Sequence, residues 1–511
     1  MQVFELTLIL LVLATVMTGI ARRIKVPYPS LLALGGIGLA LLPSGPQFTL
    51  DPELTLALFL APVLLDAAFD TSMRDLKANW IPVTCLVLIA VGVTTLGVAW
   101  VARWMVPDLP WAAAIALGAI VAPPDAAAAS AVLKQLQLPH RLLVILEGES
   151  LLNDASALLI YRLAVGAVAA GEFKAGHAIP LFALSLVGSV IAGFALSKVF
   201  SRITRSVHDP SSSIVLQFTG TFGVWILAEH LGLSAIVTIV VFAVTTARNA
   251  PSSIGARLRV PSYAVWDTVT FILNVLAFVL IGLQLRPIVE ALAPGQRLEY
   301  FEVAGAVLAT VVVIRVLWVA LYNATARLKF HYLGGGTWPG PTPPAAKNGI
   351  VIGWCGMRGI VTLAAAYALP VGFPYRDLIL LCSFFVVVGT LVVQGFTLRP
   401  LIVWLQLRDD REVDHEVRRA HERIARAALT VLDGDQSPES QELRREVMSL
   451  LDTDRGEQDG RTRHDRLRSR IVAEQRRALV QMRDDDEIGD DAFHQVEARL
   501  DWAELNAQGA E

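Results

Sequence analysis

The sequence predicts an all-α polytopic membrane protein followed by a charged, helical C-terminal domain. Within the first 407 residues, apolar runs of about 17–25 residues recur, each long enough to cross a hydrocarbon core of roughly 30 Å as a helix. The charges are distributed unevenly, because residues 408–511 hold 18 of the 43 Lys and Arg and 27 of the 46 Asp and Glu. We therefore expect a transmembrane domain over residues 1–407 and a cytoplasmic regulatory tail over residues 408–511.

The whole-chain averages conceal these two parts. The chain has 511 residues, is 54% hydrophobic and has a net charge of -3, but the first part carries +6 and the second -9. A uniformly soluble globular enzyme is therefore excluded. An outer-membrane barrel would show short alternating segments, whereas runs such as 83–101 and 303–322 are continuous. The first run, 3–20, lacks the flanks of a cleaved signal peptide, so we interpret it as a span.

Thirteen transmembrane helices are expected, with the second one short. Their ranges are 3–20, 30–43, 53–69, 81–103, 111–133, 142–168, 178–200, 212–229, 234–248, 263–285, 300–322, 347–369 and 376–398. Alternate loops are richer in Lys and Arg, beginning with Arg22, Arg23 and Lys25. By the positive-inside rule, the N-terminus lies outside and the tail in the cytoplasm of a multi-pass protein of the cell (inner) membrane.

Two further segments differ from the spans. Residues 334–344 are rich in Gly and Pro and are interpreted as a linker. In the tail, the helical spacing of Val417, Ile424 and Val431 predicts a small helical domain. The acidic run 484–487 is interpreted as a solvated helix start, since no calcium-loop spacing surrounds it.

Ionisable residues within the spans are the main functional candidates, because each costs at least a few kcal/mol in lipid. The acids are Asp66, Asp125, Glu147, Glu149 and Asp154, and the bases include Arg162, Arg315 and Arg358. For Arg315 and Arg162, an ion pair that fastens two helices is favoured over a transport role. The acids outnumber the bases, so ion pairing explains them less well.

The fifth and sixth spans combine a helix break with oxygen ligands. Asp125 follows Pro123 and Pro124, which obstruct the helix and free backbone carbonyls. Ser150 and Asp154 are four residues apart and share a helix face. Hydroxyl, carboxylate and carbonyl oxygens suit a partly dehydrated alkali cation, and no His or Cys cluster indicates a transition metal. A single carboxylate holds either a proton or a cation, which is enough to couple opposed fluxes.

The twelfth span contains Gly353, Gly356 and Gly359 around Arg358. These glycines favour either close helix packing or a local unwinding of the helix. The matching interruption in the fifth span favours unwinding, because two broken spans at corresponding places in two chain halves indicate inverted repeats around a binding site. The repeats would be spans 1–6 and 8–13.

Four motifs in this order resemble the monovalent cation:proton antiporters of the sodium/proton exchanger (NhaP/NHE) type. They are Pro123-Pro-Asp-Ala126, Glu147-Gly-Glu-Ser-Leu-Leu-Asn-Asp154, Phe278-Val-Leu-Ile-Gly-Leu-Gln284 and Gly353-Trp-Cys-Gly-Met-Arg-Gly359. The resemblance covers essentially all of residues 1–400. It implies an NhaA-like antiporter fold and a homodimer, in which spans 1–3 and 8–10 form a dimerisation part and spans 4–6 and 11–13 a moving core.

The resemblance also implies roles for individual residues. Asp154 would be the carboxylate for cation and proton, with Asn153 holding the unwound crossing. Ser150 and the backbone of Pro124 would complete a Na⁺ site with Asp154, and Asp125 would line it. Glu149 would pair with Arg358 as a structural ion pair in the core. Asn153, where an electrogenic branch has a second Asp, implies one cation exchanged for one proton.

Two departures from the family pattern concern the site. Many relatives have Glu where this chain has Asp66, so direct contact of Asp66 with the cation is left open. Many also have Thr-Asp-Pro where this chain has Pro124-Asp-Ala126. A threonine hydroxyl is therefore missing, and selectivity among Na⁺, Li⁺ and K⁺ does not transfer.

The leading hypothesis is an electroneutral Na⁺/H⁺ antiporter working by alternating access. A K⁺/H⁺ antiporter of the same mechanism is the alternative, and a cation channel regulated by the tail is a more distant one, since a channel needs a continuous polar path. A membrane enzyme is least favoured, because the histidines are scattered along the sequence. No cofactor and no nucleic-acid partner are expected. Cys85, Cys355 and Cys382 fall in apolar runs and suggest no disulfide framework or zinc site.

Overall fold

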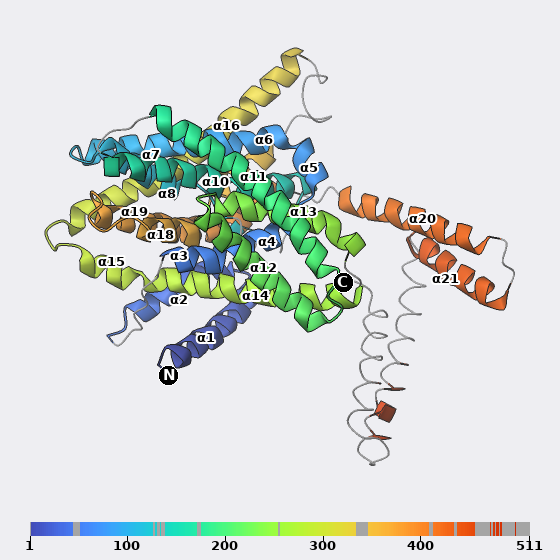
Figure 1. Ribbon diagram of the computed structural model, residues 1–511. Helices are drawn as coiled ribbons and strands as arrows, with labels where there is room; N and C mark the ends of the chain where they lie inside the picture. The colour runs from blue at the N-terminus through green and yellow to red at the C-terminus, as the bar shows by residue number, and fades with distance from the viewer. Residues whose placement is uncertain are drawn as a thin grey trace. The chain divides into compact units, whose positions relative to one another are not determined.

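The computed structural model describes residues 2–43, 52–125, 128–129, 133, 138–170, 175–253, 256–333, 346–407, 412–433 and 437–454, with isolated positions between 471 and 496. Throughout these residues the regular structure is helical. The chain forms two compact units, Met1–Asp410 and Arg411–Glu511 (Figure 1).

The first unit is built from helices of very different lengths. They are α1 (Gln2–Ile24), α2 (Tyr28–Ala40), α3 (Pro52–Thr55), the π-helical η1 (Leu56–Leu60), α4 (Ala61–Asp70), α5 (Met73–Ala78), α6 (Trp80–Thr84), the π-helical η2 (Cys85–Ala90), α7 (Val91–Met105), α8 (Trp111–Val121), α10 (His140–Ala170), α11 (Ala175–Thr204), α12 (Pro210–His230), α13 (Ala235–Ser253), α14 (Ala256–Leu283), α15 (Leu285–Ala291), α16 (Arg297–Leu333), α17 (Ala346–Trp354), α18 (Ile360–Tyr367) and α19 (Arg376–Leu405).

Many of these helices are suited to a bilayer. Among the described residues, eight helical stretches are long and apolar enough to cross a membrane. Their outer faces carry large apolar side chains, such as Val12 on α1, Trp104 on α7 and Leu317 on α16, which are 65%, 74% and 62% exposed. Apolar side chains exposed to this extent are expected where lipid surrounds the protein. All-helical membrane architecture is therefore confirmed, while the count of thirteen crossings stays a prediction.

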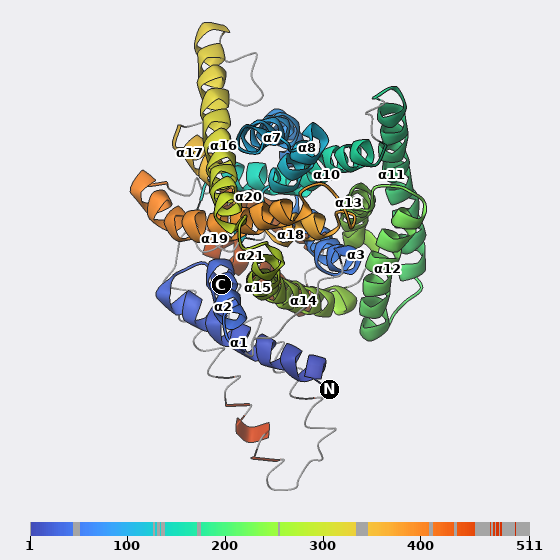
Figure 2. The ribbon, with the colours of Figure 1, turned by 90° about the vertical axis from the view of Figure 1, so that its left-hand side faces the viewer.

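The helices are arranged around α18 and α19. Figure 2 shows α1, α2 and α14 on one side of this pair and α7 and α8 on the other. The packing pairs agree, since α14 packs along α2 whereas α16 contacts both α19 and α7. A third group, α11, α12 and α13, packs together and meets α4 through α13. Gly36 and Gly282 allow α2 and α14 to approach closely, because a Cβ on either would overlap the other helix's backbone.

Both predicted helix interruptions are present. The helix α8 ends at Val121, directly before Pro123 and Pro124, and the chain from Cys355 to Gly359 is unwound between α17 and α18. The two breaks meet, because the backbone N–H of Asp125 donates to the carbonyl of Met357 at 2.7 Å. The choice between unwinding and helix packing in the twelfth span is thus resolved in favour of unwinding. The relation of the two chain halves as inverted repeats stays a prediction.

The second unit contains α20 (Glu412–Leu432) and α21 (Pro438–Asp454), which pack against each other. Ala425 is buried, while Val417, Ile424 and Val431 are exposed. The expected linker, 334–344, and the acidic run 484–487 both lie outside the described residues. Cys85, Cys355 and Cys382 are free, and the last two are buried.

Candidate cation site

The crossing of the two broken helices is held by an asparagine from α10. Asn153 is fully buried, and its Nδ2 donates to the carbonyl of Pro124 at 2.8 Å. Its Oδ1 is buried without a hydrogen-bond partner among the described residues. A buried acceptor without a partner is costly unless something binds it, and a carbonyl oxygen has two lone pairs. Asn153 thus ties α10 to the break before Asp125, and its Oδ1 is left without a partner among the described residues.

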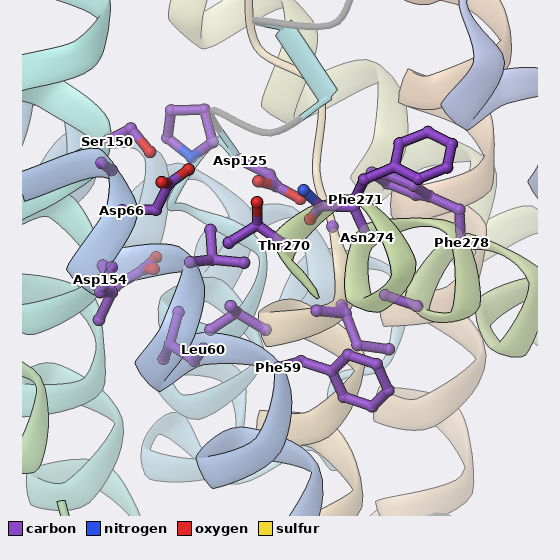
Figure 3. A pocket seen from close by; sticks show the side chains of 18 of the residues that line it. Phe59, Leu60, Asp66, Asp125, Ser150, Asp154, Thr270, Phe271, Asn274 and Phe278 are labelled. Atoms are coloured by element: carbon purple, nitrogen blue, oxygen red, sulfur yellow. The ribbon is translucent and has the colours of Figure 1, made fainter. Parts of the chain in front are cut away.

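A cavity of about 970 Å³ reaches this crossing from one end of the helix group. Its acidic and hydroxyl side chains include Asp66 on α4, Asp125 in the break, and Glu147, Ser150 and Asp154 on α10. Figure 3 shows Asp66 and Asp154 with Ser150 on one wall, and Asp125 with Thr270 and Asn274 on the facing side. The structure thus brings these side chains and the backbone of Pro124 into one space, whereas the buried Asn153 is not among the residues that line it.

The sequence of α10 explains which side chains enter the cavity. Glu147, Ser150 and Asp154 follow one another at spacings of three and four residues, so they share one face of the helix. Asp154 is only 9% exposed, whereas Glu147 is exposed. The adjacent Gly148 faces away from the cavity, where Leu76 and Val83 occupy the space that a Cβ would need. One helix therefore presents a carboxylate at the mouth and another at the deep end of the cavity.

Asp125 depends on a glycine in the opposite break. A Cβ on Gly359 would overlap the carboxylate of Asp125, so the two residues are in close contact. Both residues line the cavity. The third glycine position of the twelfth span is therefore explained by the approach of this carboxylate and not by helix packing.

The structure corrects the expected partner of Glu149. Arg315 of α16 donates to both carboxylate oxygens of Glu149, from Nη1 at 2.6 Å and from Nη2 at 2.9 Å. Arg358, the partner that the resemblance implied, is not the one that Glu149 contacts, so that expectation was wrong. The reason is the direction of Glu149, which points from α10 towards α16. The favoured ion-pair role of Arg315 is confirmed.

Both arginines also hold the unwound backbone. Nη2 of Arg315 donates to the carbonyls of Ile352 and Cys355 at 3.1 and 2.9 Å. Arg358 is fully buried and donates through Nε to Val121 at 2.8 Å and through Nη1 to Gly356 at 2.7 Å. Carbonyls left without helical partners at the end of a helix favour cations. Arg358 therefore caps the end of α8, and Arg315 caps the end of α17.

Several cavity residues were missing from the sequence-based site. Asp267, Thr270 and Asn274 line the cavity from α14, together with Phe271 and Phe278. Their spacing of three and four residues places them on one helix face, and this polar stripe in an apolar span was a detectable signal. Glu147 was counted among the acids in the spans but was given no role in the site.

At the start of α10, outside the spans, a polar cluster joins α10 to α5. His140 Nε2 lies 3.2 Å from Asp75 Oδ2, and Arg141 Nε donates to Asn79 Oδ1 at 2.9 Å. Burial raises the pKa of Asp75, but hydrogen bonds from Arg74, Ser72 and His140 outweigh it and lower that pKa to about 2. These contacts fix the first turn of α10 against α5.

The site is composed of oxygen ligands in a helical membrane scaffold. Among the described residues, no three or more His, Cys, Asp or Glu side chains are grouped so that they could hold a metal ion.

Comparison with known proteins points to one family. The family described as "Sodium/hydrogen exchanger, transmembrane" matches residues 8–404. An uncharacterised Na⁺/H⁺ exchanger of Mycobacterium tuberculosis is 30% identical over 98% of this chain and 96% of its own length. A sodium, potassium, lithium and rubidium/H⁺ antiporter of Bacillus pumilus is 29% identical over 87% of this chain and 68% of its own length.

Solved structures show the same fold. The sodium proton antiporter MjNhaP1 of Methanocaldococcus jannaschii superimposes with a TM-score of 0.59, at 19% identity, over 79% of this chain and 99% of that protein. A second structure of MjNhaP1 gives a TM-score of 0.61 at 18% identity.

Proposed function

The chain belongs to the transmembrane sodium/hydrogen exchanger family, and on that premise we propose that it exchanges one monovalent cation for one proton through a single carboxylate, Asp154. It is a membrane transporter and not an enzyme. The observation that carries the proposal is the position of Asp154. This carboxylate lies nearly buried in the wall of the cavity, on the residue next to the asparagine that holds the helix crossing.

The ligand set follows from the oxygen atoms near that carboxylate. Asp154 supplies the charge, Ser150 a hydroxyl on the same helix face, and Pro124 a backbone carbonyl. The buried Oδ1 of Asn153 is a fourth ligand candidate. Once a proton occupies Asp154, the charge that attracts the cation is lost. Cation and proton therefore compete for one group, and the exchange needs no other energy source.

Sodium is the proposed cation, and potassium is the alternative. The relative from Bacillus pumilus is named for transport of sodium, potassium, lithium and rubidium, so a site of this family type can be broad. Pro124-Asp-Ala126 lacks a threonine hydroxyl. The site therefore has one oxygen ligand fewer with which to favour small cations over larger ones.

The exchange is proposed to be electroneutral. Asn153 cannot bind a proton as a carboxylate does, and its Nδ2 is already engaged by Pro124. Asp154 is then the only group on this part of α10 that both binds the cation and carries the proton. One positive charge moves in each direction per cycle, so an imposed membrane potential has no effect on the rate.

The conformation is proposed to face the cytoplasm. Arg22, Lys25 and Arg399 line the cavity at the end where α1 and α19 finish, and the positive-inside rule assigns basic loops to that side of the cell membrane. The proposed motion is that of a core made from spans 4–6 and 11–13 against a dimerisation part, in a homodimer with the N-terminus outside.

The function is tested by dissipation of a pH gradient in proteoliposomes after addition of Na⁺, Li⁺ or K⁺. Wild-type protein is expected to dissipate the pH gradient, and the rate should be the same with and without an imposed membrane potential. Asp154→Asn is expected to abolish the response. Asp267→Asn, at an exposed carboxylate of the cavity, is the matched control and should retain exchange at the site. Proton movement by Asp154→Asn contradicts the assignment, and cation flux without protons indicates the channel alternative.

A further inference from the structure

The cavity follows α14 for part of its length and then stops. Asp267, Thr270, Asn274 and Phe278 line it at helical spacing, and Asp267 at its start is exposed. Continuing along the same face, Ile281 is fully buried. The open face of α14 is therefore sealed within one turn of the last cavity-lining residue.

A hydrogen bond joins two helices just beyond this seal. The Tyr367 hydroxyl, at the end of α18, donates to Gln284 Oε1, at the end of α14, at 2.8 Å. Gln284 is only 1% exposed. It lies six residues after Phe278, which is about 9 Å along a helix with a rise of 1.5 Å per residue. This contact thus lies on the side of the site opposite the mouth of the cavity.

The two partners belong to different packing groups. Gln284 ends a helix that packs along α2, where the backbones around Gly36 and Gly282 touch. Tyr367 ends a helix that packs mainly against α19 and α8 and less extensively against α14, while α19 also touches α2. Relative movement of these two groups must therefore stretch the bond between Tyr367 and Gln284, whereas contacts inside each group are preserved.

Tyr367 is also fixed on its own side. Arg376 at the start of α19 donates through Nη2 to the carbonyl of Tyr367 and through Nε to that of Leu369, both at 3.2 Å. The backbone of Tyr367 is thereby attached to α19. Separation of the two groups then breaks the side-chain bond to Gln284 before it moves the end of α18.

We propose that the hydrogen bond between Tyr367 and Gln284 is a latch that closes the far side of the cation site, and that it opens each time the site turns to that side. This inference rests on the proposed exchange function. The latch sets how much of the protein exposes the site away from the present cavity. It takes no part in binding the cation.

Labelling of a cysteine placed in the seal tests the latch. Ile281→Cys is introduced with Cys85→Ser, since Cys85 is the most accessible of the native cysteines and the other two are buried. A membrane-impermeant maleimide is applied to oriented vesicles from the Tyr367 side. With Tyr367→Phe added, labelling of the seal is expected to be about fivefold faster, the ratio that corresponds to one lost hydrogen bond. Tyr263→Phe, an exposed tyrosine on α14, is the control and should leave the rate unchanged.

A second variant keeps the test decisive. Gln284→Met retains the length of the side chain and removes the acceptor, so it should reproduce the faster labelling. Adding Tyr367→Phe to it should produce no further increase, because both changes remove the same bond. Equal labelling in wild type, Tyr367→Phe and Gln284→Met overturns the latch. Exchange activity that survives Asp154→Asn would overturn the proposed function instead, while the labelling result would still report on the latch.

Discussion

Glu149 and Arg315 form a bidentate ion pair in the interior of the membrane domain, with side chains only 1% and 4% exposed. The pair joins α10, which carries Asp154, to α16. Through its second contacts, Arg315 also holds the backbone of the broken twelfth span. The ion pair therefore links the helix that carries Asp154 to the unwound segment opposite it.

Removing one charge of this pair is predicted to destabilise the protein more than it changes cation affinity. Glu149→Gln leaves the guanidinium of Arg315 buried without a counter-charge, and breaking a buried pair in this way costs about 3–5 kcal/mol. The measurement is the melting temperature of purified protein in detergent, together with the apparent affinity for Na⁺. The double variant Glu149→Gln with Arg315→Met removes both charges and should recover part of the loss. A Glu149→Gln protein that melts like wild type but no longer responds to Na⁺ would refute the structural role.

Gly359→Ala is predicted to impair exchange without removing any charged group. The added methyl overlaps the carboxylate of Asp125, so either the side chain or the break must shift. We expect the apparent Km for the cation to rise roughly tenfold, as for a loss of about 1.4 kcal/mol. Gly353→Ala is the matched control in the same segment, because its Cβ would meet its nearest neighbour at 3.5 Å, an ordinary contact. Equal kinetics for the two alanine variants would show that the position of Asp125 is unimportant.

The broken helices were predictable from sequence because their causes are local. Pro123 and Pro124 obstruct a helix wherever they occur, and Gly359 weakens one. The partner of Glu149 was not predictable, since Arg315 and Arg358 lie 166 and 209 positions away and only the packing of α16 decides between them. The polar face of α14 was visible in the spacing of Thr270 and Asn274, but its direction towards the site depends on how α14 packs along α2.

Asn153→Ala is predicted to loosen the crossing of the broken helices. The bond from Nδ2 to the carbonyl of Pro124 is lost, and the buried carbonyl keeps no donor in its place. The expected cost is about 1–3 kcal/mol of stability. Thermal unfolding and the apparent Km for Na⁺ are the measurements, and both should worsen. Leu152→Ala, at the exposed neighbouring position of α10, is the control for a general effect on the helix. Unchanged melting and Km in Asn153→Ala would contradict the holding role.

The ion contacts of Asp75 are predicted to make stability pH-dependent at acidic pH. Hydrogen bonds keep the pKa of Asp75 at about 2 in the folded protein, below its ordinary value of 3.8. A lowered pKa contributes stability above pH 3.8, and this contribution is lost as the pH falls towards 2. Asp75→Asn should therefore melt at a lower temperature than wild type at pH 7, and the difference should shrink between pH 4 and pH 2. Asp108→Asn, at an exposed carboxylate, is the control. A difference that stays constant over this range would refute the interpretation.

Competition between cation and proton at Asp154 is tested most directly by counting the protons released when Na⁺ binds. Purified protein in weakly buffered solution, near the pH at which exchange is half-maximal, is titrated with Na⁺ while the released protons and the bound cation are both measured. We predict that binding of Na⁺ releases protons in the wild-type protein, with no more than one per cation, and that Asp154→Asn neither binds nor releases. Sodium binding without proton release, or release that persists in Asp154→Asn, would contradict the central claim.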